Sequence, residues 1–266
     1  IIPNSDGSGE ITKIGKGVDK KRLGQKVWVW NGQWQRPHGT ASQFISLPSE
    51  QAILIPKTMS FETGACLGIP GLTAAQCTLG DGSLKGKTIL ISGGAGSVGN
   101  LSIQLAKWSG ARVIATGSST GFDRIKNAGA DYVFGYSDPQ LEQKILEISP
   151  SGIDRVIEVE FGNNINLFPK IMKPYSVLSV YGSAKNMVPI LPFGQYLYKG
   201  IKISIELIYI LPELPRLRAI KNLHDAHFDK ALKPGIDTIY DLSECAIAHD
   251  KSLTPGRAGA ILLSTN

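Results

Sequence analysis

The segment from Gly93 to Gly99, with the sequence GGAGSVG, has the composition of a turn that lets the backbone approach a phosphate group. It follows the β-rich run from Thr88 to Ser92 and leads directly into a segment with helical periodicity. Because Gly93 and Gly96 lack side chains and a helix N-terminus exposes N–H donors, this turn is predicted to bind a dinucleotide diphosphate. Gly99 would let the helix pack closely on the strand. The turn lacks the Gly-Lys-Ser/Thr ending of a P-loop, which disfavours ATP or GTP hydrolysis.

The end of the second β-rich run bears on the choice between NAD and NADP. An acidic residue about 20 residues after the glycine turn normally holds the ribose 2′-hydroxyl of NAD. This chain has the sequence TGSST at residues 116–120, without an acid. The hydroxyl groups of Ser118 and Ser119, with Arg124 one turn into the next helix, can donate hydrogen bonds to a 2′-phosphate. The sequence therefore favours NADPH, although Arg124 also fits an ordinary solvated surface charge.

Alternating strands and helices must position this turn. From Lys87 onward, short β-rich runs alternate with amphipathic segments, a pattern typical of a parallel sheet covered by helices. We expect an α/β fold with a doubly wound six-stranded sheet. The predicted strands are Thr88 to Ser92, Arg112 to Thr116, Tyr132 to Phe134, Ile153 to Glu158, Ser176 to Val180 and Ile201 to Ile208. The predicted helices contain the apolar stripe Val98, Leu101, Leu105 and Trp108, and the segments Phe122 to Ala128, Pro139 to Ile148 and Asn164 to Met172.

The first 70 or so residues have a different pattern, in which short β-rich runs are divided by Gly, Pro and Asn. We expect a β-rich neighbouring domain there. Its predicted strands are Glu10 to Ile14, Lys26 to Trp30, Ser42 to Leu47 and Ala52 to Ile55. The tail from about Pro212 shows one helix-like run and then a strand-like run from Gly259 to Leu263.

Composition excludes several function classes. The most apolar stretch, Ile201 to Leu211, carries two charged residues and is much shorter than the roughly 20 residues of a membrane helix. Three cysteines without CxxC spacing favour a reducing cytoplasm. The net charge is +6, but the basic residues are scattered, so nucleic-acid binding is not expected as the main function.

The glycine turn, the acid-free strand end and the segment ACLGIPGLTA from Ala65 to Ala74 together resemble the zeta-crystallin-like NADPH:quinone reductases. These proteins form a zinc-free branch of the medium-chain dehydrogenase/reductase superfamily. The resemblance extends from the IPNSD segment at Ile2 to the GAILL segment at Gly259. It implies a GroES-like catalytic domain from residues 1–70 and 209–266, and a Rossmann domain from residues 71–208. Family members begin some tens of residues earlier, so the resemblance also implies that part of the catalytic domain precedes this chain.

The resemblance assigns site residues at matching positions. Thr73 corresponds to the residue behind the nicotinamide ring, and Ile69 stands where zinc-dependent relatives place a cysteine ligand. Where those relatives carry Gly-His-Glu, this chain has Asn4-Ser5-Asp6, so we expect no metal ion. The implied cofactor-binding residues are Gly93, Ala95, Gly96, Ser97, Val98 and Gly99 at the diphosphate, Ser118, Arg124 and Tyr136 at the 2′-phosphate, and Asn164, Tyr181, Gly182, Ser183, Ala184, Leu207 and Ile208 at the nicotinamide.

These observations predict a metal-independent oxidoreductase that uses NADPH to reduce a quinone or another conjugated carbonyl compound. A quinone accepts reducing equivalents without a Lewis acid, which fits a site without metal ligands. Two alternatives stay open: an enone or enoyl-thioester reductase with the same cofactor residues, and a non-catalytic protein that binds NADPH or RNA. The resemblance also implies a homodimer that pairs through the segment Ile201 to Ile208.

Overall fold

The computed structural model describes residues 1–254 and 256–265. The chain divides into two compact units. One unit combines Ile1–Leu72 with Leu223–Asn266, and the other contains Thr73–Asn222. The second unit contains the glycine-rich turn.

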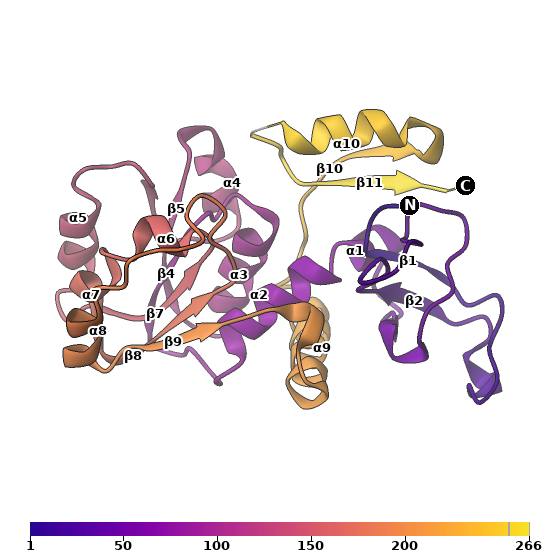
Figure 1. The fold of residues 1–266 in the computed structure, drawn as a ribbon, viewed down its shortest axis with the longest axis horizontal. Coiled ribbons are helices and arrows are strands. Elements are labelled where there is room, and N and C mark those ends of the chain that lie inside the picture. The colour runs from indigo at the N-terminus through magenta and orange to yellow at the C-terminus, as the bar shows by residue number, and fades with distance from the viewer. Residues whose placement is uncertain (255, 266) are drawn as a thin grey trace. The chain divides into compact units, whose positions relative to one another are not determined.

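The second unit is built on a six-stranded parallel sheet with the order β6-β5-β4-β7-β8-β9 (Figure 1). Its strands are β4 (Thr88–Ile91), β5 (Arg112–Gly117), β6 (Tyr132–Gly135), β7 (Ile153–Glu158), β8 (Met172–Val180) and β9 (Lys202–Ile205). The chain starts at β4 in the middle, runs outward to β6, and then returns to β7 on the other side of β4. The predicted doubly wound α/β sheet is therefore confirmed, with its switch point between β4 and β7.

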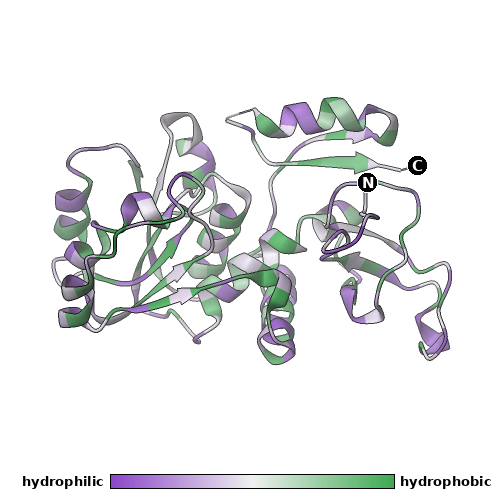
Figure 2. Ribbon diagram, viewed as in Figure 1, coloured by the Kyte–Doolittle hydropathy of each residue, from purple (hydrophilic) through white to green (hydrophobic). Residues whose placement is uncertain are grey.

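Helices flank this sheet, as expected when parallel strands are joined by crossover connections. They are α3 (Ser97–Trp108), α4 (Phe122–Asn127), α5 (Leu141–Ile148), α6 (Phe161–Asn164), α7 (Phe168–Ile171) and α8 (Phe193–Lys199). All four residues of β4 are buried, and α5 buries Leu141 and Ile145 while its other residues are more exposed. In Figure 2 the helices show both purple and green residues, typical of one apolar face packed on a sheet.

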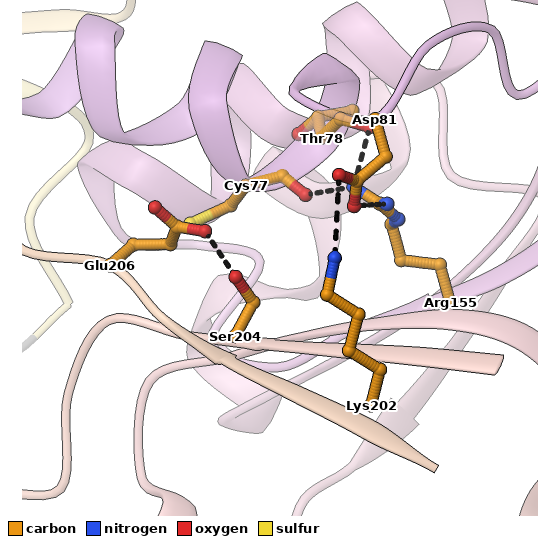
Figure 3. Close-up of polar contacts among 7 residues, drawn as sticks. All are labelled: Cys77, Thr78, Asp81, Arg155, Lys202, Ser204 and Glu206. Carbon is orange, nitrogen blue, oxygen red and sulfur yellow. Dashed lines mark hydrogen bonds and ion pairs between the residues drawn. The ribbon is translucent and has the colours of Figure 1, made fainter. Parts of the chain in front are cut away.

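A buried arginine ties helix α2 (Ile69–Leu79) to this sheet. Arg155 lies in β7, is 4% exposed, and donates hydrogen bonds to the carbonyl oxygens of Cys77 at 2.8 Å and Thr78 at 3.3 Å. Its guanidinium group also pairs with Asp81, and Lys202 approaches the same carboxylate at 3.9 Å (Figure 3). These contacts satisfy two carbonyl groups at the C-terminal end of the helix, where no intrahelical donor is available.

The first unit contains two small sheets. β1 (Gly7–Glu10), β2 (Lys26–Val29) and β3 (Ala52–Leu54) pair antiparallel in that order. β10 (Ile236–Asp241) and β11 (Ala260–Ser264) pair parallel, with α10 (Cys245–Leu253) between them in the chain. The remaining α-helices are α1 (Phe61–Ala65) and α9 (Glu213–Phe228).

Two strand predictions in the first unit were wrong. The first strand is Gly7–Glu10 rather than Glu10 to Ile14, because pairing with β2 matches Gly7 to Val29 and Glu10 to Lys26. A neighbouring strand has overridden the weak strand propensity of a Gly-Ser-Gly sequence. The segment Ser42 to Leu47 forms no strand; the hydroxyl of Ser42 donates hydrogen bonds to nearby carbonyl oxygens, which favours an irregular loop.

Three elements of the second unit also differ from the prediction, and one of them is β8, which begins at Met172 rather than at the expected Ser176. The helix expected from Asn164 to Met172 is divided into α6 and α7, because Pro169 lacks the N–H that a continuous helix would need. The strand expected from Ile201 to Ile208 ends at Ile205 and is followed by a 3-10 turn, Ile208–Ile210. Among the described residues, no helix is both long and apolar enough to cross a membrane.

Candidate cofactor-binding site

The glycine-rich turn leaves the carboxyl end of β4 in the middle of the sheet. Gly93 has a φ of +64°, a conformation that glycine adopts without strain. The N–H of Gly94 donates to the carbonyl oxygen of Thr116 at 2.8 Å, and the N–H of Gly96 donates to that of Gly93 at 2.9 Å. These bonds fold the turn back over the ends of β4 and β5.

Helix α3 begins directly after this turn. Its N-cap residue is Gly96, and no side chain caps the helix N-terminus. The first N–H groups of an α-helix have no intrahelical acceptor, and the helix dipole favours an anion beside them. A Cβ atom on Gly99 would lie 2.3 Å from the Gly93 carbonyl oxygen, so this contact excludes any larger residue. The turn therefore has the backbone cradle and the donor set that a dinucleotide diphosphate requires.

The candidate 2′-phosphate residues lie where β5, β6 and α4 meet. Ser118 follows β5 directly and is exposed, with its hydroxyl 3.0 Å from that of Thr120. Tyr136 follows β6, is 62% exposed, and donates its N–H to the carbonyl oxygen of Gly117 at 3.2 Å. Arg124 lies in α4 and is partly buried. These positions are next to the glycine-rich turn, because a Cβ atom on Gly121 would lie 2.6 Å from the Ala95 side chain.

The candidate nicotinamide residues follow β7 and β8. Asn164 ends α6, and the segment from Tyr181 to Ala184 follows β8. Hydrogen bonds join these two segments: the N–H of Phe161 donates to the Gly182 carbonyl oxygen at 3.1 Å, and that of Gly162 donates to the Ser183 hydroxyl at 2.8 Å. The turns after β7 and β8 therefore form one hydrogen-bonded wall beside the glycine-rich turn.

Two further candidates follow β9 and differ in burial. Leu207 is 46% exposed, whereas Ile208 is 3% exposed and starts a 3-10 turn. In α2, Thr73 is 6% exposed, and Ile69 is the first residue of the helix. The candidate cofactor residues of the second unit thus all follow the carboxyl ends of the strands in its six-stranded sheet. Open α/β sheets bind ligands at this edge.

Sequence reasoning missed one buried acid in this region. Glu158, the last residue of β7, is fully buried. Its carboxylate accepts hydrogen bonds from the Ser92 hydroxyl and the Asn164 amide, the latter at 3.0 Å. Burial raises the pKa of Glu158, and these donors partly oppose that effect. The available signal was an acid directly after the apolar pair Val156 and Ile157 at the end of the strand.

The sequence of residues 97–216 matches the zinc-binding dehydrogenase family. The human synaptic vesicle membrane protein VAT-1 homolog is 29% identical over 188 residues, which cover 69% of this chain and 46% of that protein. Quinone oxidoreductase from Rattus norvegicus is 26% identical over 266 residues, covering 98% of this chain and 79% of the relative. The chain thus spans about half the length of the VAT-1 relative but most of the rat protein.

The chain is therefore similar in sequence to zinc-binding dehydrogenases and to quinone oxidoreductases. A solved mycobacterial structure in complex with NADPH has the same fold as this chain, with a TM-score of 0.84. The two chains are 22% identical, and the match covers 98% of this chain and 82% of the other.

The positions that the family resemblance pairs with the ligands of zinc-dependent relatives hold no side chains of the usual zinc-binding kind. Ser5 and Ile69 occupy the corresponding positions, and neither side chain is a zinc ligand of the usual kind. Asp6 instead accepts a hydrogen bond from the N–H of Ile69 at 2.8 Å. Burial raises the pKa of Asp6 to about 7. Within residues 1–254 and 256–265, no three His, Cys, Asp or Glu side chains are grouped as a metal site requires.

Proposed function

We propose that this protein is an NADPH-dependent oxidoreductase that reduces quinones without a metal ion. The observation that carries the proposal is the diphosphate cradle between Gly93 and Gly99, placed beside a strand end that has no acid. The relative from Rattus norvegicus is named quinone oxidoreductase and matches nearly the whole chain, which supports a quinone as substrate. The mycobacterial neighbour solved with NADPH supports the cofactor.

The residues of this chain would bind and orient rather than react covalently. Backbone N–H groups of the turn and of the first turn of α3 hold the diphosphate, and Ser118, Arg124 and Tyr136 surround the 2′-phosphate. Asn164 and the segment from Tyr181 to Ala184 form the wall beside the nicotinamide. When bound, NADPH supplies two electrons and a proton, and the second proton of a hydroquinone comes from solvent.

The absence of an acid after β5 supports NADPH over NADH. A carboxylate at that position would repel a 2′-phosphate and accept a hydrogen bond from a 2′-hydroxyl. Here the position holds Ser118, whose hydroxyl can donate to a phosphate oxygen. We therefore propose that NADPH is the preferred cofactor.

We also propose a homodimer that pairs through β9. This strand is an edge of the six-stranded sheet, so one side of its backbone lacks a partner strand. Ile205 in β9 is 78% exposed, and Leu207 just beyond it is 46% exposed. Pairing about a two-fold axis would cover both the backbone edge and these apolar side chains. The proposed location is the cytoplasm, which is supported by the absence of CxxC spacing among the three cysteines of the sequence.

The decisive experiment measures NADPH oxidation by the full-length protein with panels of quinones, enones and enoyl thioesters. We expect turnover with quinones, and unchanged turnover after treatment with a zinc chelator. Turnover with enones or enoyl thioesters but not with quinones would contradict the substrate assignment. Loss of activity on chelation, restored by zinc, would contradict the metal-independent mechanism.

A further inference from the structure

Glu158 occupies the switch point of the sheet, at the carboxyl end of β7 and beside the end of β4. It is fully buried. A buried carboxyl group costs free energy unless hydrogen bonds compensate for the lost water. The hydrogen-bond partners of this carboxyl group therefore indicate its structural role.

The side chain of Glu158 connects two strand ends. One carboxylate oxygen, Oε2, accepts a hydrogen bond from the hydroxyl of Ser92, which immediately precedes the glycine-rich turn. The other, Oε1, accepts hydrogen bonds from the N–H of Glu160 and from Nδ2 of Asn164, the latter at 3.0 Å. Both oxygens are thus used, and each is directed at a different segment of the candidate site.

The main chain of Glu158 connects a third strand end. Its carbonyl oxygen accepts a hydrogen bond at 3.0 Å from the N–H of Tyr181, the first residue of the wall after β8. A single residue therefore bonds to the segment before the diphosphate turn, to Asn164, and to the segment starting at Tyr181.

The network can hold Glu158 in either protonation state. The Ser92 hydroxyl also lies 3.4 Å from the carbonyl oxygen of Ile157. It can therefore donate to that carbonyl group and accept a hydrogen bond from a protonated Glu158. In both states Oε1 remains an acceptor for the Asn164 amide, so the orientation of that amide does not depend on the charge.

We propose that Glu158 is a positioning residue for the nicotinamide half of the cofactor, acting through the side-chain amide of Asn164. The inference rests on the proposed function, because Asn164 matters here only as a residue of the nicotinamide wall. Since Oε1 uses one lone pair for the Asn164 amide, the amide oxygen is held in a fixed direction and can accept a hydrogen bond from a ligand. The adenosine half, near Ser118 and Tyr136, should not depend on Glu158.

The test compares the binding of two ligands to the same set of variants. Dissociation constants for NADPH and for 2′,5′-ADP, which lacks the nicotinamide half, are measured for wild type, Glu158→Leu, Glu158→Asp, Glu158→Gln and Asn164→Ala. The aspartate is too short to reach Asn164 in the present geometry, whereas glutamine keeps the Oε1 acceptor and can donate to Ser92. Glu142→Gln, at a partly exposed position on α5, is the matched control.

We expect Glu158→Leu and Glu158→Asp to weaken NADPH binding about tenfold and to change 2′,5′-ADP binding by less than about twofold. Glu158→Gln should recover most of the lost affinity. The double variant Glu158→Asp with Asn164→Ala should bind NADPH no more weakly than Asn164→Ala alone, because the acid acts through that amide.

Three outcomes would overturn the inference: unchanged NADPH affinity in Glu158→Asp, equal weakening of both ligands, or additive losses in the double variant. If Glu158→Leu does not fold, the aspartate and glutamine variants still decide the question. Wild-type protein that binds neither ligand would instead refute the proposed function, so the two failures are distinguishable.

Discussion

The carbonyl oxygen of Gly93 lies 2.3 Å from the position that a Cβ atom on Gly99 would occupy. The strand end and the first turn of α3 are therefore in backbone contact at this point, and only glycine permits it. This contact sets the shape of the glycine-rich turn.

We predict that Gly99→Ala weakens NADPH binding by about tenfold or more and destabilises the protein by about 1–3 kcal/mol, because the added methyl group must displace the turn. Isothermal titration calorimetry and urea denaturation measure the two effects. Gly194→Ala in α8, where a Cβ atom would meet nothing within 4 Å, is the control. Wild-type affinity in Gly99→Ala would show that the turn does not hold the cofactor.

The acid-free end of β5 predicts a preference for NADPH over NADH that one substitution should largely remove. Wild-type protein should bind NADPH at least about tenfold more tightly than NADH, and Ser118→Asp should remove most of this difference, because a carboxylate repels the 2′-phosphate. Fluorescence titration with both nucleotides measures the ratio. Ser151→Asp, exposed near the start of β7, should keep the wild-type ratio. Equal wild-type affinities would contradict the assignment.

Arg155 should be among the most costly polar residues to replace. Arg155→Met leaves the carbonyl groups of Cys77 and Thr78 without their donor, and we expect a loss of about 3 kcal/mol in the free energy of unfolding (Figure 3). Lys202→Met removes a cation that is mostly exposed and 3.9 Å from Asp81, so its cost should be within about 0.5 kcal/mol. Similar losses in both variants, measured by chemical denaturation, would contradict this account.

Asp6 should make the stability of the first unit depend on pH. Its folded pKa of about 7 is above the model-peptide value of 3.8, so the folded state holds a proton that the unfolded state releases. The free energy of unfolding should therefore fall as pH rises from about 4 to 7 and then level off. Asp6→Asn keeps an acceptor for the Ile69 N–H and should flatten this dependence, whereas the exposed Asp250→Asn should not. Parallel pH profiles for wild type and Asp6→Asn would refute the prediction.

The exposed edge of β9 predicts a dimer, and a single charged substitution in this strand should disrupt it. Light scattering of the wild-type protein should give twice the chain mass, and Ile205→Lys should give the monomer mass, because the substitution places a charge within the proposed apolar contact. Tyr132→Lys, on the opposite edge strand β6 and 41% exposed in the wild type, should remain dimeric. A monomeric wild-type protein would rule out this interface at the concentration tested.

The sequence alone predicted the elements whose signal is local. Strand β7 has the predicted bounds, Ile153–Glu158, because β-branched residues recur along it and a glycine turn precedes it. The glycine-rich turn was also recognisable, since the residues between Gly93 and Gly99 carry the conformational requirement themselves. The candidate cofactor residues followed from that turn and from the family resemblance.

Other features depended on partners far away in the chain. Strand β10 was not predicted, because its polar alternation becomes a strand only when β11 pairs with it about 20 residues later. Glu158 looked like an ordinary acid at a strand end, and only the fold brings it to Ser92 and Asn164. Local propensity and spacing determine which segments can form strands, helices and turns. The burial of a side chain and the identity of its hydrogen-bond partners are decided by tertiary packing, because both depend on residues that the sequence places far apart.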